Sequence, residues 1–126
     1  MYQIYYFCSM DKLQYIRQIN RTPEFDEYYN AQPEKVRDKY KYILNIIATQ
    51  YVISEKFVKK LETSELYEMR ISIGSNEHRT LLFAIDNLNI MQCTRVLLLN
   101  SFLKKDSKQY KREINTANEI LKRYTL

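Results

Sequence analysis

Apolar and polar residues alternate with a period of two over much of residues 66–100. From Tyr67 to Ile73 the odd positions are apolar, whereas Glu68, Arg70 and Ser72 are polar. Successive side chains leave opposite faces of a β-strand, so this segment predicts a half-buried strand whose polar face carries Arg70. The alternation predicts three antiparallel strands, at about 66–73, 77–86 and 90–100, with turns at Gly74-Ser75-Asn76 and Asp86-Asn87.

Helical spacing of apolar residues replaces the alternation on both sides of these strands. Thr22-Pro23 predicts a helix start, because threonine caps a helix and proline is tolerated in its first turn, and this helix should end near Asn30. A second helix, opened by Pro33, has its buried stripe at Val36, Tyr40, Ile43, Leu44 and Ile47. A third, at about 107–124, has its stripe at Tyr110, Ile114, Ala117, Leu121 and Tyr124.

The remaining segments complete a single α+β domain over residues 1–126. Tyr2–Phe7 predicts a first strand, Ser9–Arg21 is interpreted as a loop, and Gln50–Thr63 as a connection. The predicted architecture is a small antiparallel sheet of about four strands with a mixed edge, an N-terminal helical hairpin across one face, and a C-terminal helix. A chain of 126 residues buries about two thirds of its unfolded surface in such a domain.

The net charge of +5, with a pI near 9.1, is unevenly distributed along the chain. Residues 104–112 hold five cations and one anion, whereas residues 22–38 hold five carboxylates and two cations. A one-sided basic surface suits nucleic acid or an acidic protein partner, although clustered lysines are also common on solvated faces. The cations lie where the third helix begins, so a bound anion would offset their repulsion by the helix dipole.

Several classes of site lack their usual residues. The chain has one histidine (His78), two separated cysteines (Cys8 and Cys93) and one glycine (Gly74). We therefore expect no metal site, no Ser/His/Asp hydrolase, no P-loop or dinucleotide fingerprint, and no small-molecule cofactor. Without a membrane-spanning apolar run or a disulfide framework, the sequence predicts a cytoplasmic protein with no membrane partner.

Cations and hydroxyl groups on a sheet can cleave RNA without a metal. The ribose 2′-OH attacks the adjacent phosphate once the strand is held in line, and the protein positions the strand, neutralises developing charge and moves a proton. Arg70 and Arg79 should be near cross-strand neighbours, and they form a phosphate clamp if the turn register places them on one face. Otherwise they are a solvated pair, or one of them pairs with Glu68.

The other candidates also have two interpretations. Tyr110 belongs either to the buried stripe of the third helix or to the site, and His78 is a possible proton shuttle, although alternation places it opposite Arg79. The predicted catalytic residues are Arg70, Arg79, Lys104, Lys105 and Tyr110. The predicted RNA-binding residues are Lys59, Lys60, Lys108, Lys111 and Arg112.

Four runs, LYEMRISIG, NEHRTLLFAID, VLLLNSFLKK and KREINTANEILKRY, resemble in order and spacing the RelE/ParE superfamily of bacterial toxins, in particular its phage-related, HigB-like branch. The resemblance covers residues from about Phe25 to the C-terminus. It implies a RelE-like fold and the toxin of a type II toxin–antitoxin pair, an endoribonuclease that cuts mRNA on the ribosome and is neutralised by a helix-turn-helix antitoxin. It places Arg70 in the RNA-cutting surface and Tyr110 near a functional tyrosine. The alternative is a non-nucleolytic protein of the same fold, either a gyrase poison or a module that binds antitoxin and nucleic acid.

Overall fold

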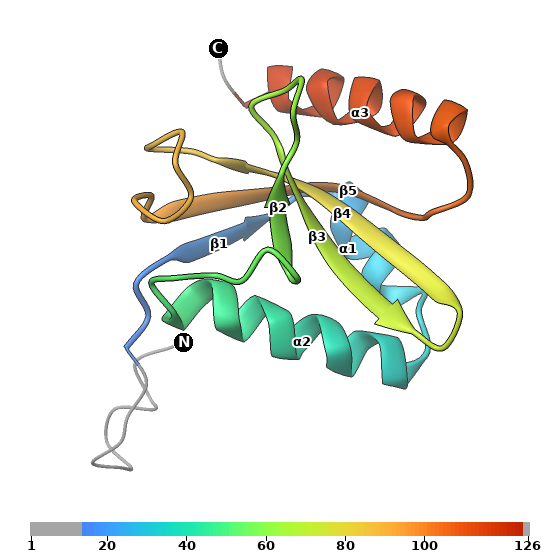
Figure 1. The fold of residues 1–126 in the computed structure, drawn as a ribbon, viewed down its shortest axis with the longest axis horizontal. Helices are drawn as coiled ribbons and strands as arrows, with labels where there is room; N and C mark the ends of the chain where they lie inside the picture. Colours follow the sequence, from blue (N-terminus) through green and yellow to red (C-terminus); the bar gives the residue numbers. More distant parts are fainter. Residues whose placement is uncertain (1–13, 125–126) are drawn as a thin grey trace.

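The computed structural model describes residues 14–124, which form a five-stranded sheet with helices on both faces (Figure 1). The elements in chain order are β1 (Gln18–Arg21), α1 (Pro23–Asn30), α2 (Glu34–Thr49), β2 (Val58–Lys60), β3 (Tyr67–Ile73), β4 (Asn76–Ala84), β5 (Arg95–Leu103) and α3 (Ser107–Lys122). The strand order is β1-β5-β4-β3-β2, with β1 parallel to β5 and all other neighbours antiparallel. The predicted α+β class with a mixed edge is confirmed.

The sheet separates two hydrophobic clusters. The helical hairpin of α1 and α2 packs Phe25, Tyr40 and Ile43 against Met69 and Ile71 of β3. On the other face, α3 packs its apolar stripe against the strands; this second cluster contains Leu81, Leu97, Leu99, Phe102, Ala117 and Ile120. The expected helical hairpin across one face is therefore confirmed, and α3 covers the opposite face (Figure 1). No helix within residues 14–124 is long and apolar enough to cross a membrane.

The boundaries of α1 agree with the prediction. The Thr22 hydroxyl accepts a hydrogen bond from the Phe25 N–H (3.1 Å), as an N-cap does, and α1 ends at Asn30. The same hydroxyl donates to the Leu99 carbonyl of β5 (2.5 Å). One threonine therefore both starts α1 and fixes it to β5, an interior strand of the sheet.

A tight hairpin joins β3 and β4 and sets their register. Gly74 has φ = +59°, a conformation that side chains disfavour, and Ile73 pairs with Asn76 across a two-residue turn. The register that follows places Arg70 directly opposite Arg79. Both arginines therefore lie on the face of the sheet covered by α3.

A β-bulge in β5 connects the sheet to α3. Thr80 pairs with Ser101 but Leu82 pairs with Leu98, so β5 has one residue more than β4 between these pairs. At the bulge, the Asn100 side-chain amide donates to the backbone carbonyl (3.1 Å) and the carboxylate (2.9 Å) of Glu113. This contact positions α3 over the strands that carry the two arginines.

Three sequence predictions require correction, and a fourth lies outside the described residues. The segment Ser9–Arg21, interpreted as a loop, contains β1, and the connection Gln50–Thr63 contains β2, because both short edge strands are specified by their partner strands rather than by alternation. The third predicted strand begins at Arg95 rather than at 90, since Ile90 and Cys93 are buried within a loop closed by Asp86. The predicted strand Tyr2–Phe7 lies outside residues 14–124.

Arg17, immediately before β1, is a buried cation with only 2 % of its surface exposed. Its guanidinium donates to backbone carbonyls at 2.6–3.2 Å, three of them at the end of α2 and two in the loop before β5: Ile47, Gln50, Tyr51, Ile90 and Met91. The carbonyls at a helix end have no partner within the helix, so one arginine satisfies them and holds the edge strand in place.

Candidate active site

A cleft of about 570 Å³ opens where the β2 edge of the sheet meets the start of α3. Its walls come from β2 and the turn after it, from β3, and from the junction of β5 with α3. The lining residues are Lys59, Lys60, Leu61, Glu62, Glu68, Arg70, Lys104, Lys105, Asp106, Ser107 and Tyr110. Six of the eleven residues named as candidates from the sequence therefore line one cavity, where five cations face three carboxylates.

Glu68 is the central polar residue of the cleft. Its side chain is 6 % exposed, and one carboxylate oxygen, Oε2, lies 2.7 Å from Nε of Arg70 and 3.7 Å from Nε of Arg79. The other oxygen, Oε1, accepts a short hydrogen bond from the Tyr110 hydroxyl. A buried carboxylate is stable only when it is paired in this way, so these four side chains form one network.

The two arginines differ in how far they reach the cleft. Arg70 is half-buried and lines the cleft, and among residues 14–124 its guanidinium bonds only Glu68, through Nε, so neither terminal amino group has a partner there. Arg79 is buried and also pairs with Glu77 (3.1 Å) and with the His78 carbonyl. Arg70 therefore lines the cleft, whereas Arg79 lies behind it and contacts Glu68.

Tyr110 both packs on the buried side of α3 and lines the cleft. Its ring packs edge-on against Phe102, with the ring centres 5.7 Å apart, and its hydroxyl reaches Glu68 from the first turn of α3. Burial and the neighbouring Glu68 carboxylate raise the pKa of Tyr110 well above its usual value of 10. The phenol therefore stays protonated at neutral pH and acts as a hydrogen-bond donor.

The lysines at the sheet edge are not equivalent. Lys59 pairs with Glu68 across the β2–β3 ladder, so its side chain shares the face of the site. The Lys60 ammonium group instead lies over the Tyr67 ring and donates to the Ser64 carbonyl (2.5 Å), which closes the turn after β2. Lys59 is thus the freer of the two to meet a ligand.

An acidic side chain, that of Asp106, lies at the start of α3. Asp106 caps the helix by accepting from the Gln109 N–H (2.8 Å), and the Gln109 side chain bonds the backbone of Lys105 and Leu103 (2.8 Å each). This cap partly offsets the repulsion between the basic residues and the helix dipole. It also fixes Lys104 and Lys105, which are exposed at the end of β5, beside the cleft.

Four of the sequence candidates, besides the buried Arg79, lie away from the cleft lining. Lys108 and Arg112 are exposed on α3, and Lys111 lines a separate pocket further along that helix. His78 faces α1, where its Nδ1 lies 2.8 Å from the Tyr28 hydroxyl, and burial lowers its pKa. The alternation along β4 predicts that His78 and Arg79 point to opposite faces of the sheet, and the structure confirms this.

Sequence reasoning named Glu68 only as a possible partner of an arginine. The alternation that put Arg70 on the polar face puts Glu68 there too, so the signal was present. What it lacked was the tertiary arrangement, which brings Arg79 from β4 and Tyr110 from α3 to the carboxylate that Arg70 of the same strand already contacts. A carboxylate, a hydroxyl donor and a cation within one cleft can take up a proton and stabilise an anion.

The fold and the cleft define a class of small α+β protein in which a mixed five-stranded sheet presents a cationic cleft beside its C-terminal helix. A mutant of the E. coli toxin RelE, solved in the free state, has a similar fold, with a TM-score of 0.56 and 13 % sequence identity over 84 % of this chain and 97 % of that chain. The chain belongs to the family of phage-derived, Gp49-like proteins (DUF891), whose model matches residues 27–122. A comparison with curated proteins found no match.

Proposed function

We propose that this protein is the toxin of a type II toxin–antitoxin pair, of the HigB-like branch, and that it cleaves mRNA on the ribosome without a metal. The observation that carries the proposal is the network of Glu68, Arg70 and Tyr110 in a cationic cleft of a RelE-like fold. The proposed partners are translating mRNA and a helix-turn-helix antitoxin, whose acidic segments would complement the basic end of α3.

In the proposed reaction, Glu68 is the general base. The ribose 2′-oxygen attacks the adjacent phosphorus while its proton passes to the Glu68 carboxylate, and the bond from phosphorus to the 5′-oxygen breaks. The leaving 5′-oxygen takes up a proton from a cleft lysine or from water, which leaves a 2′,3′-cyclic phosphate and a 5′-hydroxyl. No metal ion is required for the electron and proton balance of this step.

The cations stabilise the phosphorane-like transition state. The free amino groups of Arg70 are placed to donate to the non-bridging oxygens, with Lys59, Lys104 and Lys105 adding positive charge around them. Tyr110 holds Glu68 in orientation, and buried Arg79 balances its charge. Arg79 is accordingly a positioning residue in this mechanism.

A non-nucleolytic role, such as that of a gyrase poison or an antitoxin and nucleic-acid binding module, is favoured by one observation. Both arginines are already paired with Glu68, so a phosphate has to compete with a carboxylate for them. The two functions differ in what Glu68 does: in the nuclease it takes a proton, whereas in the binder it only holds the arginines.

The proposal is tested by inducing the protein in growing cells without its neighbouring gene. We expect growth arrest, measured as colony counts, and cut messages, measured by primer extension on a translated mRNA. Co-expression of a neighbouring helix-turn-helix reading frame should restore growth. Unimpaired growth with the full-length protein confirmed on a gel would rule out a toxin.

Arg70→Ala separates the site from the fold. Losing the cation that meets the phosphate should reduce cleavage by about a hundredfold or more, with little change in the thermal melt because Arg79 still pairs with Glu68. Arg95→Ala, which removes an exposed cation at the start of β5 outside the cleft, is the matched control and should cleave as the wild type does. Wild-type cleavage by Arg70→Ala would remove Arg70 from the site.

A further inference from the structure

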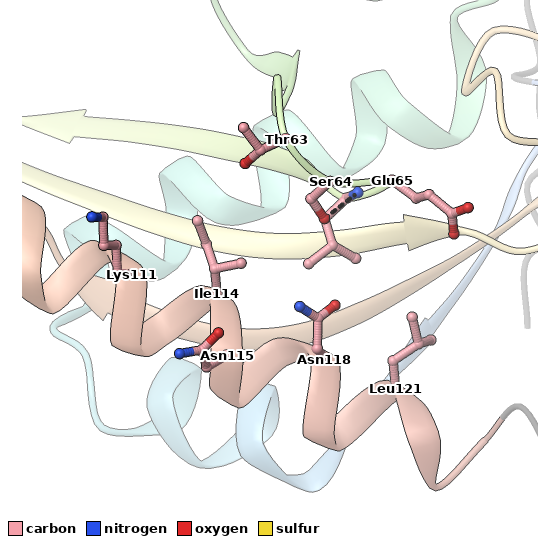
Figure 2. A pocket seen from close by; sticks show the side chains of 9 residues that line it. Thr63, Ser64, Glu65, Lys111, Ile114, Asn115, Asn118 and Leu121 are labelled. Carbon is pink, nitrogen blue, oxygen red and sulfur yellow. Dashed lines mark hydrogen bonds between the residues drawn. The ribbon is translucent and has the colours of Figure 1, made fainter.

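A second pocket, of about 550 Å³, lies beside the cleft, between α3 and the turn that joins β2 to β3 (Figure 2). The turn contributes Ser64 and Glu65, and α3 faces them across the pocket with Lys111, Asn115 and Asn118 (Figure 2). Leu66 and Ile114 add apolar surface. The volume is in the range of pockets that hold small ligands.

The wall formed by the turn is preformed. The Leu61 N–H donates to the Leu66 carbonyl (3.0 Å), and the Ser64 hydroxyl oxygen accepts from the Leu66 N–H (3.1 Å). The Lys60 ammonium group adds a bond to the Ser64 carbonyl. A ligand entering this pocket therefore does not have to order the turn first.

Two asparagines line the pocket with side-chain amides that are available for hydrogen bonds. Asn115 and Asn118 lie one helical turn apart on α3, and Figure 2 shows the Asn118 amide pointing toward Ser64 across the pocket. No other residue within 14–124 makes a hydrogen bond or ion pair with either side chain. Each amide offers a donor and an acceptor side by side, which is the pattern that pairs with the edge of a nucleobase.

The pocket and the cleft are lined by neighbouring residues of α3 and of the turn after β2. Tyr110 lines the cleft, and the next residue, Lys111, lines the pocket; on the other wall, Leu61 and Glu62 line the cleft, and Thr63 and Ser64 line the pocket. An RNA strand held with one phosphate at Arg70 can therefore extend along α3 toward the pocket. Lys111 stands at the junction, where a backbone phosphate would pass.

We propose that this pocket holds an unpaired nucleobase next to the cleaved linkage, and that Asn115 and Asn118 read its edge and so set the base preference of cleavage. The apolar side chains contact the faces of the base, and the amides hydrogen-bond the donors and acceptors along its edge. The inference rests on the proposed function, since it assigns a specificity subsite to the same site.

The test maps the 5′ ends of cleaved messages in cells that express the wild type, Asn115→Ala/Asn118→Ala, or the control Thr116→Ala on the exposed side of α3. The wild type and the control should prefer one base at one fixed position beside the cut. The double variant should lose that preference by roughly tenfold while total cleavage stays within a few-fold. Alanine favours helices, so α3 should remain folded; a thermal melt checks this, and single Asn115→Ala is the milder variant if it does not.

The outcomes are distinguishable. A wild type that does not cut RNA overturns the proposed function and this inference with it. A wild type that cuts without base preference, or a double variant whose preference is unchanged, overturns the inference alone. A double variant that keeps its preference but is no longer neutralised by the neighbouring antitoxin identifies the pocket as a protein-docking surface, which also overturns the inference.

Discussion

At the scale of single residues, the buried carboxylate of Glu68 organises the site. An unpaired carboxylate at this depth would be strongly destabilising, and the two guanidinium groups and the Tyr110 hydroxyl compensate for its burial. The same contacts restrict its orientation. Glu68 therefore serves the fold and the proposed reaction through one set of bonds.

Glu68→Gln separates these two roles. The amide keeps the size of the side chain and can still accept from Tyr110, but it cannot take a proton from the 2′-oxygen. We expect cleavage to fall by about a hundredfold or more, while binding of RNA is unchanged or tighter because a competing negative charge is gone. Rates from primer extension and affinities from filter binding check this, with Glu62→Gln on the cleft rim as the control. Cleavage at the wild-type rate would exclude Glu68 as the base.

At the scale of secondary-structure elements, α3 carries both the site and the basic surface. Its first turn supplies Tyr110 to the cleft, its second supplies Lys111 to the neighbouring pocket, and Asn100 of the bulged β5 holds it on the sheet. Cations at a helix start oppose the dipole, and Asp106 offsets this only in part. A helix selected for stability alone would not carry them there.

Neutralising Lys108 and Lys111 together tests this view of α3. We expect Lys108→Gln/Lys111→Gln to weaken RNA or ribosome binding and to lower the slope of log Kd against log salt by about 1.4–1.8, because two fewer phosphate contacts displace fewer counterions. Stability should be unchanged or slightly higher. Binding at several salt concentrations and a denaturant midpoint are the measurements, with Lys35→Gln/Lys41→Gln on α2 as a charge-matched control. A loss of stability with binding and salt slope unchanged would assign these lysines to the fold.

At the scale of the whole molecule, Arg17 joins parts of the chain that are far apart in sequence. Arg17 lies directly before the edge strand β1. Its guanidinium donates hydrogen bonds to the end of α2 and to the loop before β5, and that loop lies more than seventy residues after Arg17 in the sequence. Hydrogen bonds of this kind replace both a helix C-cap and a loop closure.

Arg17→Met keeps most of the apolar length of the side chain and removes every one of these bonds. We expect a loss of about 2–4 kcal/mol, because several carbonyls lose a charged donor while remaining buried. The check is the denaturant midpoint, compared with that of Arg112→Met, an exposed arginine whose loss should cost little. Equal midpoints for the two variants would contradict a structural role for Arg17.

The elements with strong local signals could be predicted from the sequence. The Thr22-Pro23 start of α1, the apolar stripe of α2, the Gly74 turn and the alternation in β3 each depend on residues near one another in the chain, and each prediction was confirmed. The edge strands β1 and β2 were missed because their hydrogen bonds come from partner strands. Ile90 and Cys93 were predicted to belong to a strand because apolar residues buried in a loop give the same sequence pattern as apolar residues buried in a strand.

The sequence by itself determined the α+β class, the buried face of α2 and most of that of α3, and the placement of Arg70 on a polar face, since periodicity and charge are local properties. The predicted stripe of α3 was wrong at its end, where Ile120 is buried and Tyr124, beyond the helix, is exposed. Only the tertiary structure decided the site. The turn register placed Arg70 opposite Arg79, and the bulge and the cap of α3 brought Tyr110 onto Glu68. Such contacts join residues as far as 42 positions apart, and their geometry is set by strand pairing and helix packing, which no local pattern contains.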